Sequence, residues 1–152
     1  MILARQDIIA RRPIVDMAED AFVAHGRTGG LSACGYDLTL GEPVVLWPNK
    51  FVLSVAAEQF DMPDDLMGLV TSKSSLARDG VWMPMTTIEP GWRGFLTLEI
   101  TNHADEVKRF PQGYPIAQVL FMALTQPTDR PYAGRYQDQP ARPVPAIDAG
   151  DE

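Results

Sequence analysis

Residues 88–102 read IEPGWRGFLTLEITN, and from residue 95 onward this stretch has the alternation of a β-strand. A period of two divides the side chains between two faces. One face carries Phe95, Thr97, Glu99 and Thr101, and the other carries Leu96, Leu98 and Ile100. The second face is wholly aliphatic, so the stretch predicts a strand that lies against a core and holds one carboxylate, Glu99, in the middle of its other face.

Short apolar runs of the same kind recur along the chain. They are YDLTL at 36–40, PVVLW at 43–47, KFVLSVA at 50–56, LMGLV at 66–70 and PIAQVLFMAL at 115–124. Turn residues, chiefly Pro and Gly, separate these short runs. This arrangement predicts a mainly β sandwich or barrel.

The two ends of the chain differ from this pattern. Residues 1–20 predict one short helix that contains Ile2, Leu3, Ile8 and Ile9 and stops before Pro13, followed by a glycine-rich joint, HGRTGG, at 25–30. From Pro127 the sequence is rich in Pro, Asp and Gly and has no period. We therefore expect a β domain over 1–130 and a C-terminal arm over 131–152 whose end can be disordered.

Composition limits the class of protein. The chain has 152 residues, 45% of them hydrophobic, and a net charge of −7, so its overall field repels nucleic acid polymers. A single cysteine, Cys34, excludes an internal disulfide framework and favours a reducing compartment, the cytoplasm. No apolar run approaches about 20 residues, so we expect no contact with a membrane.

Residues 71–80, TSKSSLARDG, crowd hydroxyls and cations into one turn after a predicted strand. The pattern predicts a helix that begins here with Ser72 or Ser74 as its N-cap. The free amides of such a turn, with Lys73, suit a phosphate, and Ser74 and Arg78 share one helical face. Plain capping with a solvated arginine is the alternative interpretation.

Glu99 also has two interpretations. A carboxylate that is partly removed from water has its charged form disfavoured and can carry protons near neutral pH. The alternative is a glutamate on the solvated face of an antiparallel sheet.

The sequence lacks the residues that several other classes of catalytic site require. Zinc-dependent base deaminases require a Cys pair and a His or Cys beside a Glu, whereas Cys34 is alone and His25 and His103 are far apart in sequence. Neither a serine hydrolase motif nor a Walker phosphate loop is present. Trp47, Trp82 and Trp92 are expected to pack in the core or an interface.

The motifs together resemble a known family. SKSSLARDGV, IEPGWRGFLTLEITN, YPIAQVLF and PYAGRYQDQ, in this order, are similar to the successive motifs of the dCTP deaminase branch of the dUTPase-like superfamily. MILARQDI and SACGYDLTLG resemble that branch as well, so the resemblance extends through most of residues 1–140.

The resemblance implies a distorted β-barrel or jelly-roll that assembles as a homotrimer with active sites between subunits. It also implies deamination of dCTP to dUTP and ammonia without a protein-bound metal, in which Mg²⁺ is carried by the substrate triphosphate. Glu99 is similar to the family's proton shuttle, with Ser74 and Arg78 as its partners. The implied nucleotide-binding residues are Lys73, Ser75, Gln118, Tyr132, Arg135 and Gln139, of which the last three would close over the triphosphate.

The chain departs from that branch in two places. Ser72 and Lys73 stand where the branch has Gly-Arg, and the segment VWMPMTTIE, residues 81–89, is about two residues shorter and lacks the branch's His and Thr-Ala pair. The shorter length resembles the dUTPase branch, whose water-activating Asp corresponds to Glu89. A dUTP diphosphatase, a bifunctional deaminase-diphosphatase or a modified cytosine as substrate therefore remain alternatives. The deaminase is favoured because dUTPases lack a carboxylate at Glu99 and because their glycine-rich C-terminal motif is absent.

A further alternative belongs to another class of protein. The chain could be an inactive nucleotide-binding trimer with a regulatory role, which keeps the fold without turnover. Such a protein would be expected to have lost part of the set Glu99, Ser74 and Arg78, and all three are present.

Overall fold

A computed structural model describes residues 1–149 of the chain. Two helices and eleven strands follow one another in this part. They are α1 (Arg5–Arg11), β1 (Ala21–Ala24), β2 (Arg27–Leu31), β3 (Tyr36–Thr39), β4 (Val44–Leu46), β5 (Phe51–Asp61), β6 (Leu66–Ser72), α2 (Ser74–Ala77), β7 (Val81–Trp82), β8 (Thr86–Ile88), β9 (Arg93–Asn102), β10 (Lys108–Phe110) and β11 (Pro115–Ala123). The predicted mainly β fold is confirmed, and no described helix is both long and apolar enough to cross a membrane.

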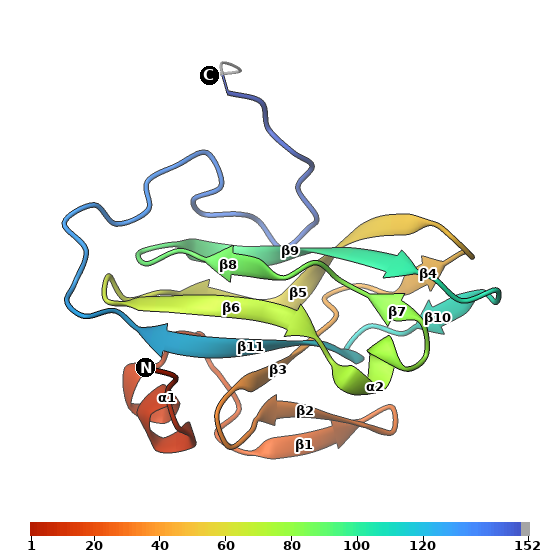
Figure 1. Cartoon of the computed structure of the whole chain (residues 1–152), viewed down its shortest axis with the longest axis horizontal. Coiled ribbons are helices and arrows are strands. Elements are labelled where there is room, and N and C mark those ends of the chain that lie inside the picture. The colour runs from red at the N-terminus through yellow and green to blue at the C-terminus, as the bar shows by residue number, and fades with distance from the viewer. Residues whose placement is uncertain (150–152) are drawn as a thin grey trace.

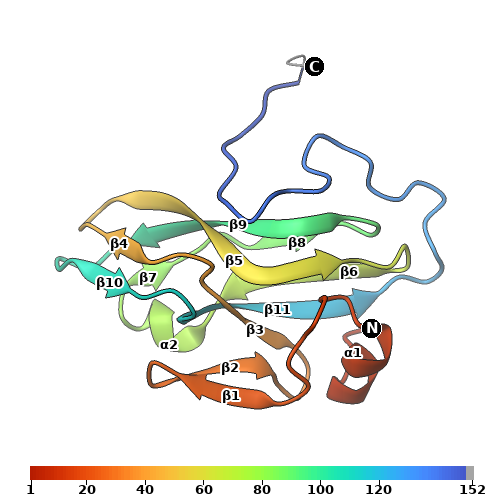
Figure 2. The ribbon, with the colours of Figure 1, turned by 180° about the vertical axis from the view of Figure 1, so that it is seen from behind.

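The strands form layered antiparallel sheets (Figure 1). One sheet has the order β1-β2-β3-β11-β6-β8, a second has the order β5-β9-β7, and β10 pairs with β4. Figure 2 shows from behind that β5 and β9 lie along the β6–β11 layer, and that the β1–β2 hairpin forms the far end of the same sheet, beyond β3. The residues after β11 leave this layer and run back along β9 and β8 as the C-terminal arm.

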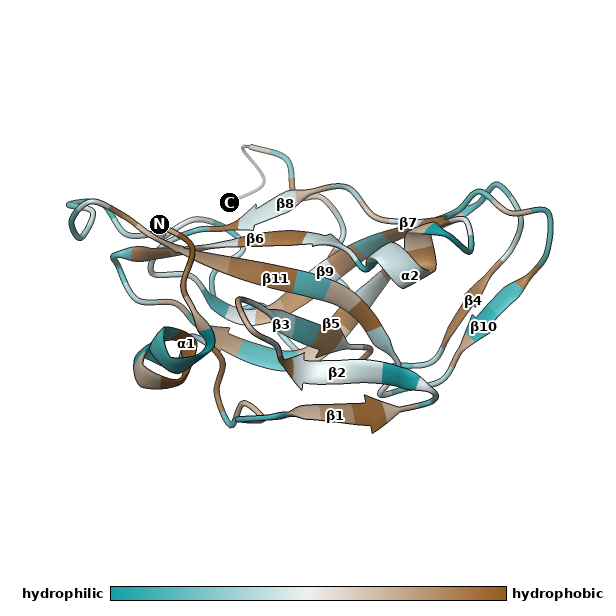
Figure 3. Ribbon diagram, turned by 60° about the horizontal axis from the view of Figure 1, so that its bottom comes forward, coloured by the Kyte–Doolittle hydropathy of each residue, from teal (hydrophilic) through white to brown (hydrophobic). Residues whose placement is uncertain are grey.

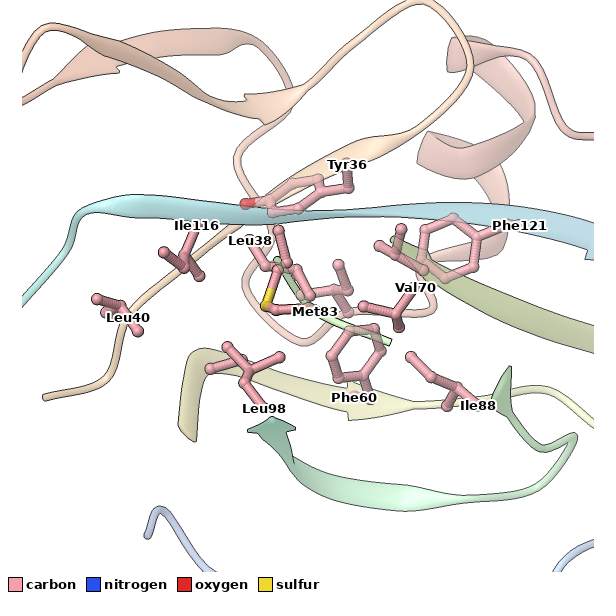
Figure 4. Packing of buried hydrophobic residues seen from close by; sticks show 14 of the residues in the cluster. Tyr36, Leu38, Leu40, Phe60, Val70, Met83, Ile88, Leu98, Ile116 and Phe121 are labelled. Atoms are coloured by element: carbon pink, nitrogen blue, oxygen red, sulfur yellow. The ribbon is translucent and has the colours of Figure 1, made fainter. Parts of the chain in front are cut away.

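The core lies between these layers. Phe60, Leu66, Ile100 and Phe121 are almost completely buried, and Figure 4 shows Phe60 of β5 beside Val70 and Ile88. Figure 3 shows that β11 is mainly hydrophobic, whereas the visible surface of α1 is mainly hydrophilic. Burial of aliphatic faces from several strands stabilises this arrangement, because each fully buried large apolar side chain contributes about 1.5–3 kcal/mol.

Pairing between β5 and β9 fixes the position of Glu99. Leu53 pairs with Glu99 and Phe51 with Thr101, and the register shifts between Val55 and Gln59 of β5. Phe95 was predicted to share a face with Thr97 and Glu99, but it instead lies among residues 14–18 and 57–59. Leu96, predicted for the other face, lies with Thr97 and Glu99. The predicted period of two therefore holds from residue 97 onward and is wrong for Phe95 and Leu96.

The N-terminal helix is shorter than predicted. It begins at Arg5 and ends where Arg12 adopts a left-handed conformation (φ 44°), directly before Pro13. Leu3 precedes the helix and donates its amide to Phe121 O at 2.8 Å, so the first residues extend the edge of β11. Ile2 pairs with Met122 in the same way. This pairing joins residues about 120 positions apart, so the helical periodicity of the sequence cannot predict it.

The expected joint at 25–30 is instead part of a β-hairpin. His25 and Gly26 have positive φ angles of 51° and 74° and form the two-residue turn between β1 and β2. Gly29 pairs with Phe22, and a Cβ at Gly29 would lie 2.6 Å from the Phe22 ring. Gly29 leaves room for the Phe22 ring on the neighbouring strand. The glycines at 29–30 therefore belong to a packed strand and not to a flexible joint.

The three tryptophans have different environments. Trp92 is 5% exposed and packs against Phe60 with ring centroids 6.0 Å apart. Trp47 and Trp82 are 59% and 49% exposed, so they do not belong to the core of this chain.

Candidate active site

A cleft of about 520 Å³ lies where the arm crosses β9. Its walls come from β5, the segment 86–89, β9 and the arm between residues 132 and 146. Three predicted site residues line it: Glu99 from β9, and Tyr132 and Gln139 from the arm. Glu89, the alternative base, lies on the rim as an exposed side chain.

Glu99 is half-buried on the floor of this cleft. Burial raises the pKa of its carboxyl group above the ordinary value, and a hydrogen bond from its own backbone amide opposes the shift only in part. No hydrogen bond or ion pair joins the Glu99 side chain to another residue among residues 1–149. A desolvated carboxylate of this kind can accept a proton from water and return it, which is the requirement for general acid–base catalysis.

The walls around Glu99 are largely apolar. Phe51 and Leu53 approach from β5, and Leu96 and Trp92 from the β9 side. The indole Nε1 of Trp92 donates a hydrogen bond of 2.6 Å to Tyr136 O, which ties the wall to the arm. An apolar cleft with a few polar groups suits a flat heterocycle better than a solvated anion.

The arm is joined to β9 by hydrogen bonds in which backbone amides are the donors. The amide of Phe95 donates to Gln139 O at 3.0 Å, and the amide of Val144 donates to the Thr97 hydroxyl at 3.0 Å. Arg135 is exposed and lies outside the cleft lining, with its guanidinium donating to Ile147 O at 2.7 Å. The arm thus covers the cleft of its own chain, and Arg135 braces the arm from outside.

Two glycines of the GWRG sequence permit the arm to approach. A Cβ at Gly94 would lie 2.5 Å from Gln139 N, and a Cβ at Gly91 would lie 2.6 Å from Pro131 Cβ. Both glycines also have positive φ angles, 136° at Gly94 and 80° at Gly91. Because any side chain here would collide with the arm, these glycines link the β8–β9 turn to the closed position of residues 131–139.

The serine-rich turn forms α2, but neither predicted serine caps it. Lys73 is the N-cap residue, and no side chain donates or accepts a capping hydrogen bond there. The Ser72 hydroxyl instead donates to Met83 O at 3.2 Å and accepts from Met83 N at 2.8 Å. The capping prediction is therefore wrong, since Ser72 is used to join β6 to the segment after β7.

Lys73 and Gln118 meet at Asp37 rather than at the cleft. The Lys73 ammonium forms a buried ion pair with Asp37 Oδ2 and donates to Thr28 O at 2.7 Å. Gln118 donates to the other carboxylate oxygen of Asp37 at 3.1 Å. Asp37 thus gathers two of the residues expected at the nucleotide, and both of its carboxylate oxygens accept hydrogen bonds within this chain.

Ser74 and Ser75 lie on α2 and Arg78 is its C-cap residue, away from the Glu99 cleft of the same chain. Ser74 and Arg78 are exposed, and none of the three lines that cleft. One chain therefore does not bring Glu99 together with Ser74 and Arg78.

Several cleft residues were not singled out from the sequence. Tyr136 and residues 144–146 line the cleft because the arm folds back, and nothing in their local pattern indicates this contact. Thr97 was placed on the face of Glu99 by the period of two, and that signal was sufficient to find it.

A family model described as dCTP deaminase-like matches residues 12–124. The chain belongs to the dCTP deaminase-like family. It is 34% identical over 122 residues to the dCTP deaminase of Thermococcus gammatolerans, covering 70% of this chain and 78% of that protein. It is 36% identical over 111 residues to the dCTP deaminase of Campylobacter fetus, covering 71% and 60% respectively. The chain is therefore an enzyme of this family, although it spans less than two thirds of the Campylobacter protein.

Solved structures with a similar fold include dUTPases. A mutant dUTPase of phage phi11 of S. aureus, described with a structural Mg(II) ion, has a TM-score of 0.55 and 20% identity, covering 67% of this chain and 84% of that one. A dUTPase of phage 80alpha has a TM-score of 0.58 and 19% identity, covering 80% and 94%. These neighbours show that this member of the dCTP deaminase-like family has the jelly-roll-like fold of dUTPases.

Proposed function

We propose that this enzyme hydrolytically deaminates dCTP to dUTP and ammonia in pyrimidine deoxynucleotide metabolism, with Glu99 as the proton shuttle. The observation that carries the proposal is the half-buried Glu99 carboxylate in a largely apolar cleft covered by the arm. Membership of the dCTP deaminase-like family supports the same reaction. The single cysteine is consistent with action in the cytoplasm.

In this reaction Glu99 accepts a proton from water as the water oxygen attacks the ring carbon that bears the amino group. The carboxyl group passes that proton to the ring nitrogen. It then takes the proton of the added hydroxyl and delivers it to the amine, so the C–N bond breaks, ammonia leaves and the carbonyl of dUTP forms. Proton transfer of this kind contributes about 10²–10⁴-fold, or roughly 3–5 kcal/mol. Enzymes lower barriers by at least about 8 kcal/mol, so positioning and preorganised donors must supply the remainder.

Ser74 and Arg78 are the donors that we assign to this task, and they would come from a neighbouring chain. They are exposed on α2 and absent from the lining of the cleft in their own chain. A homotrimer with active sites between subunits would bring them to Glu99 of an adjacent subunit. Arm residues Tyr132, Arg135 and Gln139 would then close over the triphosphate.

The remaining phosphate contacts and the ion belong to the same proposal. Ser75 of α2 is free to face the phosphates, whereas Lys73 and Gln118 would first have to leave Asp37. Within residues 1–149, no group of three or more His, Cys, Asp or Glu side chains could hold a metal. Mg²⁺ would therefore take phosphate and water oxygens as ligands, as it commonly does with nucleotides.

Glu89 supports a second candidate, a dUTP diphosphatase or a bifunctional enzyme that continues to dUMP. Its carboxylate lies on the rim of the cleft that contains Glu99, so one bound nucleotide could meet both groups. Glu89 is exposed whereas Glu99 is half-buried, so the main proposal assigns the chemistry to Glu99.

Incubation with dCTP and dUTP in separate reactions tests these functions. Ammonia from dCTP without pyrophosphate from dUTP is the result expected for a deaminase. Both products together would identify the bifunctional enzyme. Pyrophosphate from dUTP alone would overturn the main proposal, and binding of either nucleotide without any product would favour the inactive regulatory trimer.

A further inference from the structure

The β1–β2 hairpin contacts the residues at both ends of α2, the helix that begins at Ser74 and has Arg78 as its C-cap residue. α2 has only four residues, and Leu76 is its one buried side chain. A helix of this length does not hold its conformation in water without outside contacts. The orientation of Ser74 and Arg78 therefore depends on Lys73, the N-cap residue, and on Asp79, which follows the C-cap residue Arg78.

The first anchor holds the N-terminal end of α2. Lys73 is buried, and its ammonium group binds Asp37 and the carbonyl oxygen of Thr28. Thr28 belongs to β2, and Asp37 lies on β3, which pairs with β2 through Gly30. This anchor is a buried charge pair, so it fixes the place where the helix begins.

The second anchor holds the C-terminal end. Asp79 follows Arg78 directly, and its Oδ2 accepts a hydrogen bond of 2.9 Å from Arg27 Nη2. The Arg27 guanidinium is fixed in turn, because its Nε donates to the Tyr114 hydroxyl at 3.1 Å. Figure 1 shows α2 between β7 and the end of the β2 strand that carries Arg27.

We propose that Arg27 is a positioning residue for Ser74 and Arg78, which acts by holding Asp79 and thereby setting the orientation of α2. The inference rests on the proposed function of these two α2 residues. Arg27 lies outside the Glu99 cleft of its own chain, so it has no assigned contact with the nucleotide.

Because the Arg27–Asp79 ion pair is partly exposed, its expected role is to position α2 rather than to stabilise the whole fold. The side chains of Arg27 and Asp79 are 34% and 50% exposed. Surface ion pairs of this kind contribute little to global stability. Asp79 is nevertheless the residue next to Arg78, so a change in its position moves the guanidinium that the proposed site uses. Displacement of a catalytic group by about 1 Å can cost up to 10²-fold in rate.

The test uses Arg27→Ala and Asp79→Ala, singly and together, in the full chain. Each single variant is expected to lower kcat for dCTP about 10-fold to 100-fold with a smaller change in KM, while the melting temperature stays within a few degrees. Because the two residues act as a unit, the double variant should be no slower than either single variant. Additive losses in the double variant would overturn the proposal.

Two further variants provide the controls. Arg27→Lys should recover part of the lost kcat, because an ammonium can reach Asp79 but lacks the fork that also binds Tyr114. Arg5→Ala removes a guanidinium that likewise bridges two acceptors, Glu19 O and Asp20, far from α2. Arg5→Ala should leave kcat unchanged, and an equal loss there would show a general effect of arginine removal.

Hydrogen exchange gives a readout that is independent of activity. The amides of Ala77 and Arg78 donate to Lys73 O and Ser74 O within α2. Arg27→Ala should accelerate their exchange, and Arg5→Ala should not. Unchanged exchange together with unchanged kcat would overturn the inference. If the wild-type enzyme releases no ammonia from dCTP, the proposed function fails, and the exchange rates still decide whether Arg27 holds α2.

Discussion

The backbone amide of Val144 donates a hydrogen bond of 3.0 Å to the hydroxyl of Thr97, two residues before Glu99 on the same strand. This bond places the end of the arm beside the carboxylate to which we assign the chemistry. It joins residues 47 positions apart in sequence. The folded arm supplies one wall of the cleft, through Tyr132, Tyr136, Gln139 and residues 144–146.

Glu99→Gln tests the proton shuttle. We expect ammonia release from dCTP to fall by at least about 10²-fold, because the amide keeps the shape of the side chain and cannot transfer the proton. The melting temperature should change little. Glu106→Gln is the matched control, since Glu106 is a largely exposed glutamate outside the cleft. If Glu99→Gln retained turnover, Glu99 would not be the proton shuttle, and its alternative interpretation as a solvated residue of the sheet would be favoured.

The pH dependence of kcat/KM tests the environment of Glu99. Burial raises the pKa of Glu99, so the acid limb of the profile should lie above the ordinary range of a glutamic acid. An acid limb at or below that ordinary range would contradict the assignment of Glu99 as the base.

The free energy of unfolding should also depend on pH, in a direction set by the raised pKa of Glu99. A carboxyl group whose pKa is raised on folding contributes stability below its unfolded pKa, and this contribution is lost as the pH rises through the folded value. As the pH rises from the unfolded pKa of Glu99 to its raised folded pKa, the free energy of unfolding of the wild type should therefore fall relative to that of Glu99→Gln. Burial also raises the pKa of Glu58, and its effect cancels in the difference between the two proteins.

Gly94→Ala tests the docking of the arm. The added methyl group would lie 2.5 Å from Gln139 N, so the arm must move away from β9. We expect KM for the nucleotide to rise about tenfold or more, and tryptophan fluorescence to change because Trp92 contacts the arm. Gly113→Ala also places alanine at positive φ, but its nearest neighbour is 4.0 Å away. An equal effect of both substitutions would indicate backbone strain rather than loss of docking.

Truncation after Arg130 removes the arm as a whole. We expect KM to rise far more than the melting temperature falls, because the arm residues are mostly exposed or half-buried and the core lies between the sheets. Titration with nucleotide and thermal unfolding of the same sample measure both effects. Unchanged affinity would show that the arm does not close over the substrate.

Asp37→Asn tests the role of the buried ion pair. Loss of the negative charge leaves Lys73 buried and uncompensated, which should lower the free energy of unfolding by about 3–5 kcal/mol. Replacement of both partners, Asp37→Leu with Lys73→Met, should recover much of this loss because no charge remains buried. Denaturant unfolding compares the two. A small loss in Asp37→Asn would indicate that Lys73 is free to turn toward a phosphate.

Much of the fold was predictable because it depends on local patterns. The aliphatic face of β9 and the runs that became β3, β5, β6 and β11 are periodic, and periodicity follows directly from strand geometry. The β1–β2 hairpin was missed because its glycines accommodate Phe22, which is a cross-strand contact. The position of Phe95 was missed because the register shift lies in its partner strand, β5.

The sequence by itself determined the mainly β class, the two faces of the later half of β9 and the presence of one carboxylate opposite the core. It also carried the motifs of the dCTP deaminase-like family. Only the tertiary structure decided that Lys73 binds Asp37, that the arm covers Glu99, and that Arg27 holds Asp79. These contacts join residues distant in the chain, and their partners are selected by packing and charge in three dimensions rather than by any local period.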